Sequence, residues 1–505
     1  MNHAARLERD DWPWLLSLLL IGGLTLGAFA ITAHRLNDGQ GGVPLDDAWI
    51  HFQFARNLAR GDGLSFNPGH PTAGSTAPLW TLLLAAVYVV GGRFPGAGQL
   101  LSAASFLATL AVTYALGKRL TSHRWTAWLA GAVVAVNGRM VWAGLSALET
   151  CLFATLSLLA IHAHLDDRTS HRYRWRTAAL FGLAALARPE GYLLFALAMA
   201  DFIASDILPT PFDASRFTRY ASRLLLFTAI VLPYLIFSLR TSGHLLPNTY
   251  HAKAVFDFRP DLAFLSLTSR YLILDNFLLL PFYILGLGAL FRRASLLSLW
   301  SAGLPLVYAF LHAVLYQHGR YLMPLIPCNA VIGVAGLLEA RRLARLRGWN
   351  LTMGRKGSIL VILLVFAGTA WRLPVMASEY GWNVHDINEM HVALGRWVAE
   401  HTPPDAVLAL NDIGAIAYIS ERPVVDLAGL ITPEVVPLLH APDRDACLVK
   451  LLAGRDVQYV IIFPDWFPDL AKRHDLLEPV HQVTLERRTI SGGETMIVYR
   501  ADWRR

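Results

Sequence analysis

The chain has 505 residues, of which 54% are hydrophobic and only 16% are charged, and its mean hydropathy is +0.41. Many of its apolar runs approach the roughly 20 residues that a helix needs to cross a bilayer, which excludes an ordinary soluble protein. The net charge of +7 does not indicate nucleic-acid binding, because the arginines and lysines gather in short loops between apolar runs, as in the inner loops of membrane proteins.

The first apolar run, Trp12–Thr32, predicts a membrane span. It is followed by "PLDDAWIHFQFARNLARGDG" (Pro44–Gly63), in which polar and apolar residues fall on two different faces of a helix. The polar face comprises Gln53, Arg56, Asn57 and Arg60. The pattern predicts an amphipathic helix lying at the membrane surface. Its head carries two adjacent carboxylates, Asp46 and Asp47.

The apolar segment Ala77–Gly92 decides the topology, because at about 16 residues it is short for a span. If it crossed the membrane, the five basic clusters that follow would all face outward. They lie at 118–124, 168–176, 216–223, 292–293 and 341–356. Because positive loops face the cytoplasm, we predict that Ala77–Gly92 lies in the outer interface and that the N-terminus is cytoplasmic.

The remaining apolar runs then predict about eleven crossings in all. They are Gly98–Leu116, Thr126–Ala143, Leu148–His164, a hairpin of two short helices in Thr177–Ser205, Leu224–Leu239, Ile273–Leu290, Leu296–Val314, Tyr321–Leu338 and Gly357–Trp371. We therefore expect a polytopic α-helical membrane domain over residues 1–373, with an outer loop at 33–97 that carries the acidic pair and the interfacial helices.

Beyond Arg372 the chain contains more charge and proline and no further run of spanning length. A helix is expected to stop at Pro403-Pro404, "AVLAL", "PVVDL" and "VQYVIIF" read as buried strands, and Gly492-Gly493 marks the turn of a hairpin. Residues 374–505 thus predict an extracytoplasmic α/β domain of ordinary size. It either caps the membrane part or grips the substrate.

Because the topology places both ends of the acidic segment outside, Asp46 and Asp47 lie at the outer membrane surface. At a helix N-terminus the helix dipole favours their ionised form. Two interpretations stay open on spacing alone: a reactive carboxylate pair, or a pair that only caps the helix.

The sequence resembles the GT-C glycosyltransferases, integral-membrane enzymes that use lipid-phosphate-linked sugars, and most of all their bacterial branch of cell-wall arabinofuranosyltransferases. The segments that carry the resemblance are "DDAWIHFQFARNLARGDGLSFNPGHPTAGSTAPLW", "LSALET", "LARPEG", "LLPNTYHAK", "HGRYLMPLIP" and "NDIGAIAYISERPVVDLAGL". The acidic pair is Asp-Glu in many of these enzymes and Asp46-Asp47 here, which leaves open which carboxylate acts.

The resemblance implies transfer of a sugar from a polyprenyl-phosphate donor to a cell-envelope glycan, lipid or protein on the outer face of a bacterial inner membrane. A carboxylate takes the proton of the acceptor hydroxyl, and Asp46 is the first choice for it. The resemblance also implies substrate-binding residues. Lys253 and Arg320 are suited to the donor phosphate, and Tyr321 follows in the same motif. The other candidates are Asn248, Tyr250, His251, Glu149, Arg188 and Glu190.

Structural roles compete with several of these assignments. Arg188 could pair with a carboxylate in place of substrate, because a lone charge near the membrane is costly. His51 and His318 read as hydrogen-bonding residues, and the three cysteines show no metal-like spacing. No cofactor is indicated with certainty, although a divalent cation at Asp46 and Asp47 stays open because some similar enzymes use one.

Two other functions fit a membrane protein of this kind. A transporter or flippase of lipid-linked sugars would place ionisable residues along its spans and carry an internal repeat, but here those residues cluster on one side and no repeat is visible. A non-catalytic scaffold whose outer domain binds glycan is the second alternative, and only an activity assay separates it from an enzyme.

Overall fold

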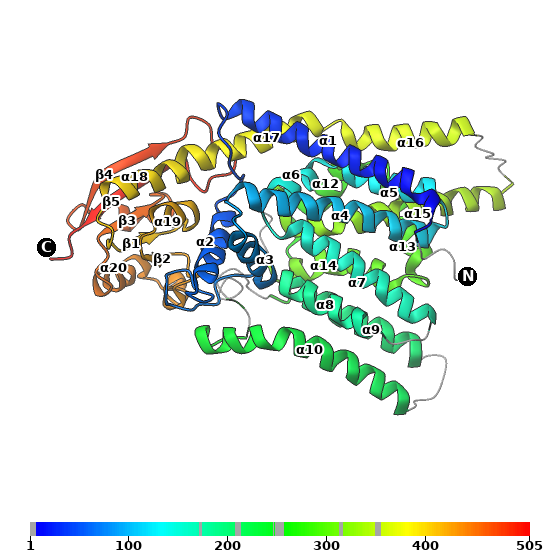
Figure 1. The fold of residues 1–505 in the computed structure, drawn as a ribbon, viewed down its shortest axis with the longest axis horizontal. Helices are drawn as coiled ribbons and strands as arrows, with labels where there is room; N and C mark the ends of the chain where they lie inside the picture. The colour runs from blue at the N-terminus through cyan, green and yellow to red at the C-terminus, as the bar shows by residue number, and fades with distance from the viewer. Residues whose placement is uncertain are drawn as a thin grey trace. The chain divides into compact units, whose positions relative to one another are not determined.

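The computed structural model describes residues 7–170, 174–207, 214–245, 247, 257–312, 317–348 and 355–504 (Figure 1). The chain forms two compact units, each built from segments distant in sequence. The first unit comprises Met1–Ala30, Leu100–Pro233 and Val255–Ala377. The second comprises Ile31–Gln99, Tyr234–Ala254 and Ser378–Arg505. The predicted outer loop and the C-terminal segment therefore belong to one unit.

Helices make up the described part of the first unit. They are α1 (Trp12–Leu36), α4 (Gly96–Thr121), α5 (Arg124–Ala135), α6 (Gly138–Leu145), α7 (Thr150–Ser170), α8 (Trp175–Ala187), α9 (Glu190–Ile207), α10 (Ala214–Ser242), α12 (Leu262–Asn276), α13 (Leu280–Phe291), α14 (Ser295–Phe310), α15 (Ile326–Leu346) and α16 (Arg355–Ala370), with the short helical segment η2 (Gln317–Leu325) before α15. The prediction of a polytopic helical membrane fold is confirmed, and every predicted apolar run coincides with one or two of these helices.

Five helices of the described chain are long and apolar enough to cross a membrane, and the number rises to seven if each of two bent helix pairs counts as one span. The predicted total of about eleven crossings stays a prediction. The hairpin of short helices is present as α8 and α9. Two runs predicted as continuous spans are broken: α5 and α6 meet at 64°, and α12 and α13 at 104°.

Both bends follow from local chemistry. Asn137, between α5 and α6, accepts a hydrogen bond from the backbone N–H of Met140 and so caps a new helix. Asn276, the last residue of α12, accepts a hydrogen bond from the backbone N–H of Leu279. Pro281 lies in the first turn of α13, where no backbone N–H is needed for a hydrogen bond within the helix. Hydropathy cannot detect such breaks because the residues on both sides are apolar.

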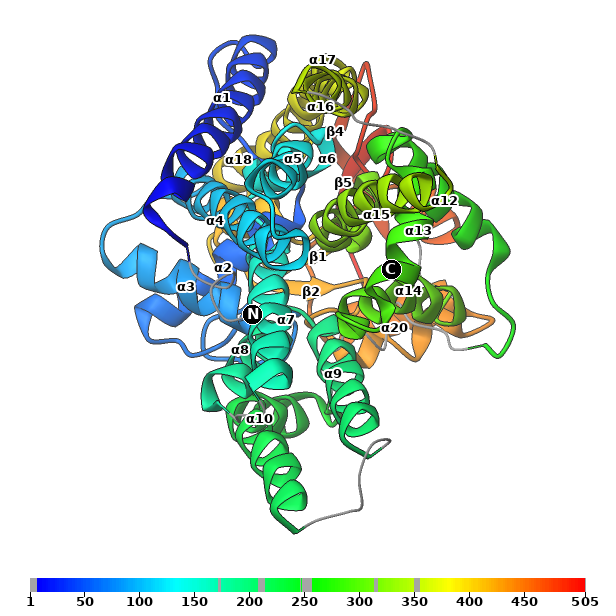
Figure 2. The same ribbon diagram turned by 90° about the vertical axis from the view of Figure 1, so that its right-hand side faces the viewer.

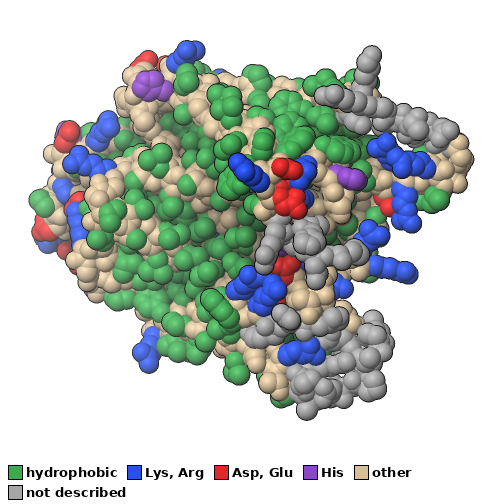
Figure 3. Space-filling model, turned by 45° about the vertical axis from the view of Figure 1, so that its right-hand side comes forward, with side chains coloured by type: hydrophobic (Ala, Val, Ile, Leu, Met, Phe, Trp, Pro, Cys, Tyr) green, Lys and Arg blue, Asp and Glu red, His purple; other side chains and the backbone are tan. Residues whose placement is uncertain are grey.

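Hydrophobic side chains cover much of the molecular face seen in Figure 3. On α1 the exposed positions recur every four residues, at Leu16, Leu20 and Leu24. An exposed leucine stripe of this kind suits contact with lipid and would be unfavourable in water. It supports the assignment of the chain as a membrane protein.

Two glycines let α13 and α15 approach closely, and Figure 2 shows the two helices side by side. A Cβ added at Gly286 would lie 2.0 Å from the carbonyl oxygen of Ile332, and one added at Gly336 would lie 1.7 Å from that of Phe282. Small residues at such contacts are characteristic of membrane helix packing. No larger residue fits at either position without separating the helices.

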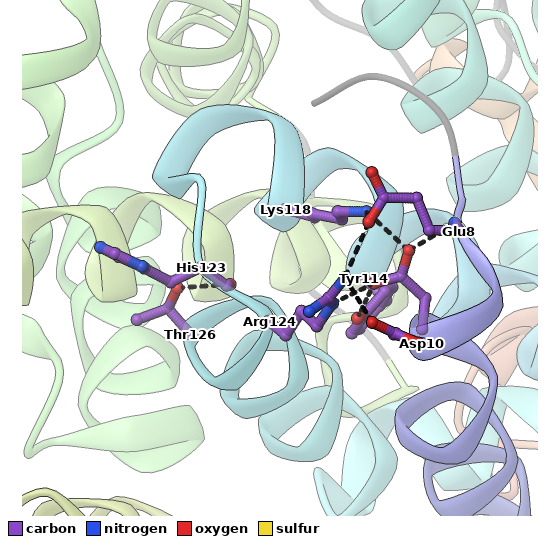
Figure 4. A network of polar contacts seen from close by, with 8 residues as sticks. Glu8, Asp10, Tyr114, Lys118, His123, Arg124 and Thr126 are labelled. Carbon is purple, nitrogen blue, oxygen red and sulfur yellow. Dashed lines mark hydrogen bonds and ion pairs between the residues drawn. The ribbon is translucent and has the colours of Figure 1, made fainter. Parts of the chain in front are cut away.

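Near the start of α1 a buried polar network ties three helices of the first unit together (Figure 4). Asp11 is fully buried and accepts hydrogen bonds from Tyr114 Oη (2.8 Å), Lys118 Nζ (2.6 Å) and Arg124 Nε (3.2 Å). Arg124 also pairs with Glu8 at 2.7 Å. Because three donors bind its carboxylate, Asp11 can stay buried at this helix end, while Glu8 and Arg124 reach the surface.

The second unit combines helices with one sheet. Its main helices are α2 (Asp47–Arg60), α3 (Pro78–Val89), α17 (Leu373–Asp386), which starts in the first unit, a π-helical turn (Ile387–Val392), α18 (Ala393–His401), α19 (Gly414–Ser420), α20 (Arg444–Gly454) and α21 (Pro468–Ala471). The strands are β1 (Leu408–Leu410), β2 (Val424–Asp426), β3 (Tyr459–Ile462), β4 (Leu477–Thr484) and β5 (Thr495–Ala501). All the strands predicted from the sequence are present.

The sheet has the order β2-β1-β3-β5-β4, in which β1 pairs parallel with β2 and β3 while β5 pairs antiparallel with β3 and β4. One face of the sheet shares a core with α2, because Ile50 and Phe54 are buried in the same cluster as Leu408, Ile461 and Val498. The helix that follows the acidic pair is thus an integral part of the C-terminal α/β unit.

Helix α3 occupies the segment on which the topology prediction depends. It has 12 residues, and at 1.5 Å per residue it is roughly 18 Å long, well short of a hydrocarbon core of about 30 Å. This length excludes α3 as a full helical span. Its position in the outer interface stays a prediction.

Candidate active site

Asp46 stands immediately before α2 but does not cap it, since its side chain makes no hydrogen bond to the α2 backbone. Its carboxylate instead binds the start of α19, where Oδ2 accepts from Gly414 N–H and Oδ1 from Ala415 N–H, both at 2.7 Å. The helix-cap interpretation is therefore wrong for Asp46. A carboxylate fixed by two N–H groups has a defined orientation, as a reacting group requires.

The backbone around Gly414 is shaped for this contact. A Cβ at Gly414 would lie 2.2 Å from the carbonyl oxygen of Asp46 and 2.7 Å from its carboxyl carbon. Two residues earlier, Asp412 Oδ2 lies 2.9 Å from Nε2 of His391, whose side chain is fully buried. The segment that receives Asp46 is thus anchored to the helical run that follows α17.

Burial and nearby charges set the protonation state of the Asp46 carboxyl group. Burial raises the pKa of Asp46 to about 6, with Asp412 adding to the effect, although the positive charge of His391 and the two N–H donors act in the opposite direction. Burial alone would lower the pKa of His391, but the hydrogen bond to Asp412 and the charge of Asp46 raise it. A carboxyl group whose pKa lies near neutral pH is suited to proton transfer.

Asp47 is the first residue of α2, and its side chain is half-buried where that of Asp46 is only 9% exposed. The two adjacent carboxylates therefore occupy different environments. Asp46 is held by the N-terminus of α19, whereas Asp47 is the more exposed of the two.

Three of the four residues on the polar face of α2, Gln53, Arg56 and Asn57, are buried, whereas Arg60 at the end of the helix is exposed. Arg56 is buried, donates to the carbonyl of Tyr418 (2.9 Å) and to Glu421 (2.8 Å), and lies 4.2 Å from the Tyr418 ring centre. Asn57 donates to the carbonyl oxygens of Ser65 and Phe66. The Arg56 contacts fasten α2 to the C-terminal end of α19, and the Asn57 contacts hold the segment that follows α2.

In the first unit Arg188 is buried between two carboxylates. It donates to Glu149 Oε1 at 2.8 Å and to Glu190 Oε1 at 2.6 Å, and Tyr308 Oη donates to Glu190 as well. The structural pairing considered from the sequence is therefore present. With all three charges partnered, the cluster is stable in a buried position.

Arg320 and Tyr321 join the same cluster. The Tyr321 ring centre lies 5.3 Å from the guanidinium of Arg188 and 5.2 Å from that of Arg320. The structure thus brings five of the predicted site residues together within the first unit: Glu149, Arg188, Glu190, Arg320 and Tyr321. Four predicted residues, Asn248, Tyr250, His251 and Lys253, lie outside the described residues.

The described residues do not supply a set of metal ligands at the acidic pair. Both oxygens of Asp46 accept backbone N–H bonds, and no three His, Cys, Asp or Glu side chains of the described chain come close enough to hold one ion. His51 lies against Thr81 and His318 packs on Trp142.

Sequence reasoning missed several members of these clusters. His391 and Asp412 lie in segments that read as ordinary helix and loop. Arg139 and Asp275 were detectable in principle, because each is a charge within a predicted span, where an ionisable residue is a candidate functional group by default. Their pairing at 2.6 Å requires tertiary structure.

Solved structures resemble this chain along almost its whole length. ArnT from Cupriavidus metallidurans bound to undecaprenyl phosphate has a TM-score of 0.61 at 13% identity, with 95% of this chain and 97% of that chain covered, and its apo structure has a TM-score of 0.60 at 15% identity with the same coverage. The Archaeoglobus fulgidus oligosaccharyltransferase in complex with Zn and sulfate has a TM-score of 0.56 at 12% identity, covering 93% and 73%.

The arabinofuranosyltransferase AftD from Mycobacteria also resembles the chain, with a TM-score of 0.52 at 14% identity, covering 98% of this chain and 42% of that one. Residues 382–504 match a family described as a domain of unknown function, DUF8728. No curated protein sequence matches the chain. At these identities the structural likeness establishes the fold.

Proposed function

Since the chain has the fold of the GT-C glycosyltransferases, we propose that it transfers a sugar from a polyprenyl-phosphate donor to a cell-envelope acceptor. One observation carries this proposal most directly: nearly the whole chain superposes on ArnT in its complex with undecaprenyl phosphate. The fold likeness to AftD and the resemblance of the sequence motifs favour a pentose or hexose as the transferred sugar.

Asp46 is the general base in this reaction. It removes the proton from the acceptor hydroxyl while that oxygen bonds to the anomeric carbon of the donor, and the bond from that carbon to the phosphate oxygen breaks. The hydrogen bonds from α19 keep the carboxylate oriented, and a pKa of about 6 leaves it ionised at neutral pH. General-base assistance of this kind contributes about 10²- to 10⁴-fold.

The leaving polyprenyl phosphate carries negative charge, which fixed cations stabilise. Arg320 provides one such cation from η2, and Lys253, which lies outside the described residues, is proposed as a second. Asn248, Tyr250 and His251, also outside the described residues, are proposed to hold the sugar. Arg188, with Glu149 and Glu190, keeps Tyr321 and Arg320 in place and contributes to binding through them.

The chain is a membrane protein, and we place it in a bacterial inner membrane with the N-terminus inside and residues 374–505 outside. The charge distribution of its loops supports this orientation. Reporter fusions after Gly92 and after Lys118 test it: they should signal an outer and a cytoplasmic position, respectively. A cytoplasmic signal at Gly92 would invert the topology and overturn an outward-facing Asp46.

The activity itself is tested with the full-length protein in lipid nanodiscs. Undecaprenyl phosphate carrying radiolabelled pentose or hexose is supplied with cell-envelope glycan, and transfer of label is measured. Mass spectrometry of envelope glycans from a deletion strain identifies the sugar that is lost. Unaltered glycans together with absent transfer for every donor sugar would overturn the enzymatic assignment.

A further inference from the structure

A strained backbone segment stands directly before Arg320. Gln317, His318 and Gly319 have φ values of 55°, 58° and 66°, three left-handed residues in succession. Residues other than glycine visit this region rarely and usually singly, because the Cβ atom then lies too close to the following carbonyl oxygen. Such a conformation persists only where neighbouring groups hold it.

Arg139 of α6 makes the contacts that keep this segment in the left-handed conformation. Its Nε donates to the carbonyl oxygen of His318 at 2.8 Å and its Nη2 to that of Gly319 at 2.9 Å, so two successive strained residues are bound by one guanidinium group. The planar fork of arginine suits this paired contact, which a lysine cannot reproduce.

Arg139 is itself fixed from a third helix. Its Nη1 donates to Asp275 Oδ2 at 2.6 Å, its guanidinium lies 4.1 Å from the Tyr271 ring centre, and its side chain is only 4% exposed. Asn137 completes the arrangement by donating to the other oxygen of Asp275 at 3.1 Å. The bend at Asn137 and helix α12 thus cooperate in orienting one guanidinium.

Position 319 leaves no room for a residue larger than glycine. A Cβ at Gly319 would lie 2.7 Å from the Tyr271 ring and 2.9 Å from Nη2 of Arg139. The residue that follows is Arg320, whose side chain is buried next to Tyr321. The direction of its side chain is therefore set by a backbone that Arg139 and Asp275 hold.

We propose that Arg139, together with Asp275, is a positioning residue that locks Gln317–Gly319 in the left-handed conformation and thereby aims Arg320 at the phosphate of the lipid-linked donor. The part concerning the donor rests on the proposed function. When the lock is removed, the segment relaxes and the Arg320 guanidinium moves away from the phosphate. Misplacement of a binding group by about an ångström lowers its contribution by about tenfold to a hundredfold.

The test compares Arg139→Gln and Asp275→Asn with the wild type in nanodiscs. Hydrogen exchange of the Gly319–Tyr321 amides should become faster in both variants, and the Kd for undecaprenyl phosphate should rise by about tenfold or more. Transfer assays should show a raised KM for the donor and an unchanged KM for the acceptor. Arg342→Gln, which removes an exposed arginine of α15, is the matched control and should change none of these values.

A rescue variant separates positioning from general loss of structure. Gln317→Gly removes the steric penalty at one left-handed position, so Arg139→Gln combined with Gln317→Gly should recover part of the phosphate binding. Unchanged hydrogen exchange in Arg139→Gln, or a rise in acceptor KM equal to that for the donor, would overturn the inference. Failure of the wild type to bind undecaprenyl phosphate would overturn the proposed donor instead. The hydrogen-exchange rates of the Gly319–Tyr321 amides would still show whether Arg139 holds this segment.

Discussion

The carboxylate of Asp46 accepts a 2.7 Å hydrogen bond from the backbone N–H of Gly414, 368 residues further along the chain. This bond joins the acidic motif before α2 to the C-terminal sheet segment of the same unit. It explains why the same unit contains both segments: the sheet unit supplies the groups that hold the proposed base.

Asp46→Asn preserves the size of the side chain but removes its ability to accept a proton. We expect transfer to fall by about a hundredfold or more while undecaprenyl phosphate still binds, because binding of the lipid phosphate does not use this group. Asp47→Asn should reduce transfer less, as the more accessible neighbour is not the base. Single-turnover rates of both variants check this order, and the reverse order would move the base to Asp47.

The stability of the second unit should depend on pH through Asp46. Its pKa is raised from the usual 3.8 to about 6, so between these values the folded state binds the proton more tightly than the unfolded chain does. The stabilisation is complete below about pH 4 and is lost as the pH rises through about 6. The raised pKa of His391 acts in the same direction at higher pH. Hydrogen-exchange protection of β1 and β3 should therefore fall from pH 4 to pH 7. The Asp46→Asn variant should show a weaker dependence of this protection on pH. An equally strong pH dependence in the variant would contradict the prediction.

Gly414→Ala should separate α19 from Asp46, because the new Cβ would lie 2.2 Å from the Asp46 carbonyl oxygen. We expect a loss of about 1–3 kcal/mol in the stability of the second unit and a parallel drop in transfer. Gly454→Ala is the matched control, since a Cβ there meets nothing within 4 Å. Thermal unfolding and transfer rates measure both effects. Equal behaviour of the two variants would show that the contact tolerates a methyl group.

Arg56→Lys should weaken the clamp between α2 and α19. Lysine cannot at once reach the Tyr418 carbonyl, Glu421 and Gln53, so buried acceptors lose their donors at a cost of about 1–3 kcal/mol. Arg60→Lys is the comparison, because Arg60 is exposed and its 3.4 Å pair with Glu421 contributes little. Proteolysis of the loop after α2 reports release of the helix. Similar susceptibility of the two variants would argue against the clamp.

Gly336→Ala should disrupt the membrane part, because its Cβ would lie 1.7 Å from the Phe282 carbonyl oxygen and force α13 and α15 apart. Loss of close packing should lower the thermal stability in detergent by several degrees, corresponding to about 1–3 kcal/mol. Gly288→Ala on α13, where a Cβ meets nothing within 4 Å, should leave stability unchanged or slightly raised. A stable Gly336→Ala variant would show that the two helices can shift.

Local patterns in the sequence determine much of this protein. Apolar runs, the short buried-strand segments and the proline stop after α18 predict elements correctly, because hydrophobic pattern and turn chemistry act over a few residues. Residue type and the family resemblance also single out the acidic pair and Glu149, Arg188 and Glu190 as candidates, and the pairing of Arg188 with carboxylates that the sequence suggests is present.

Only the tertiary structure decided which groups these residues meet. The sequence predicts α2 as an amphipathic helix at the membrane surface, yet Arg56 on its polar face is buried and donates to the Tyr418 carbonyl of α19. Spacing alone leaves Asp46 open as a helix cap or a reactive carboxylate, and in the structure it binds Gly414 and Ala415. Arg139 binds Asp275 and the backbone before Arg320, and each of these partners lies more than a hundred residues further along the chain. The physical reason is the same in each case: burying a charged or polar group is favourable only with a matched partner, and that partner is fixed by packing between segments far apart in sequence.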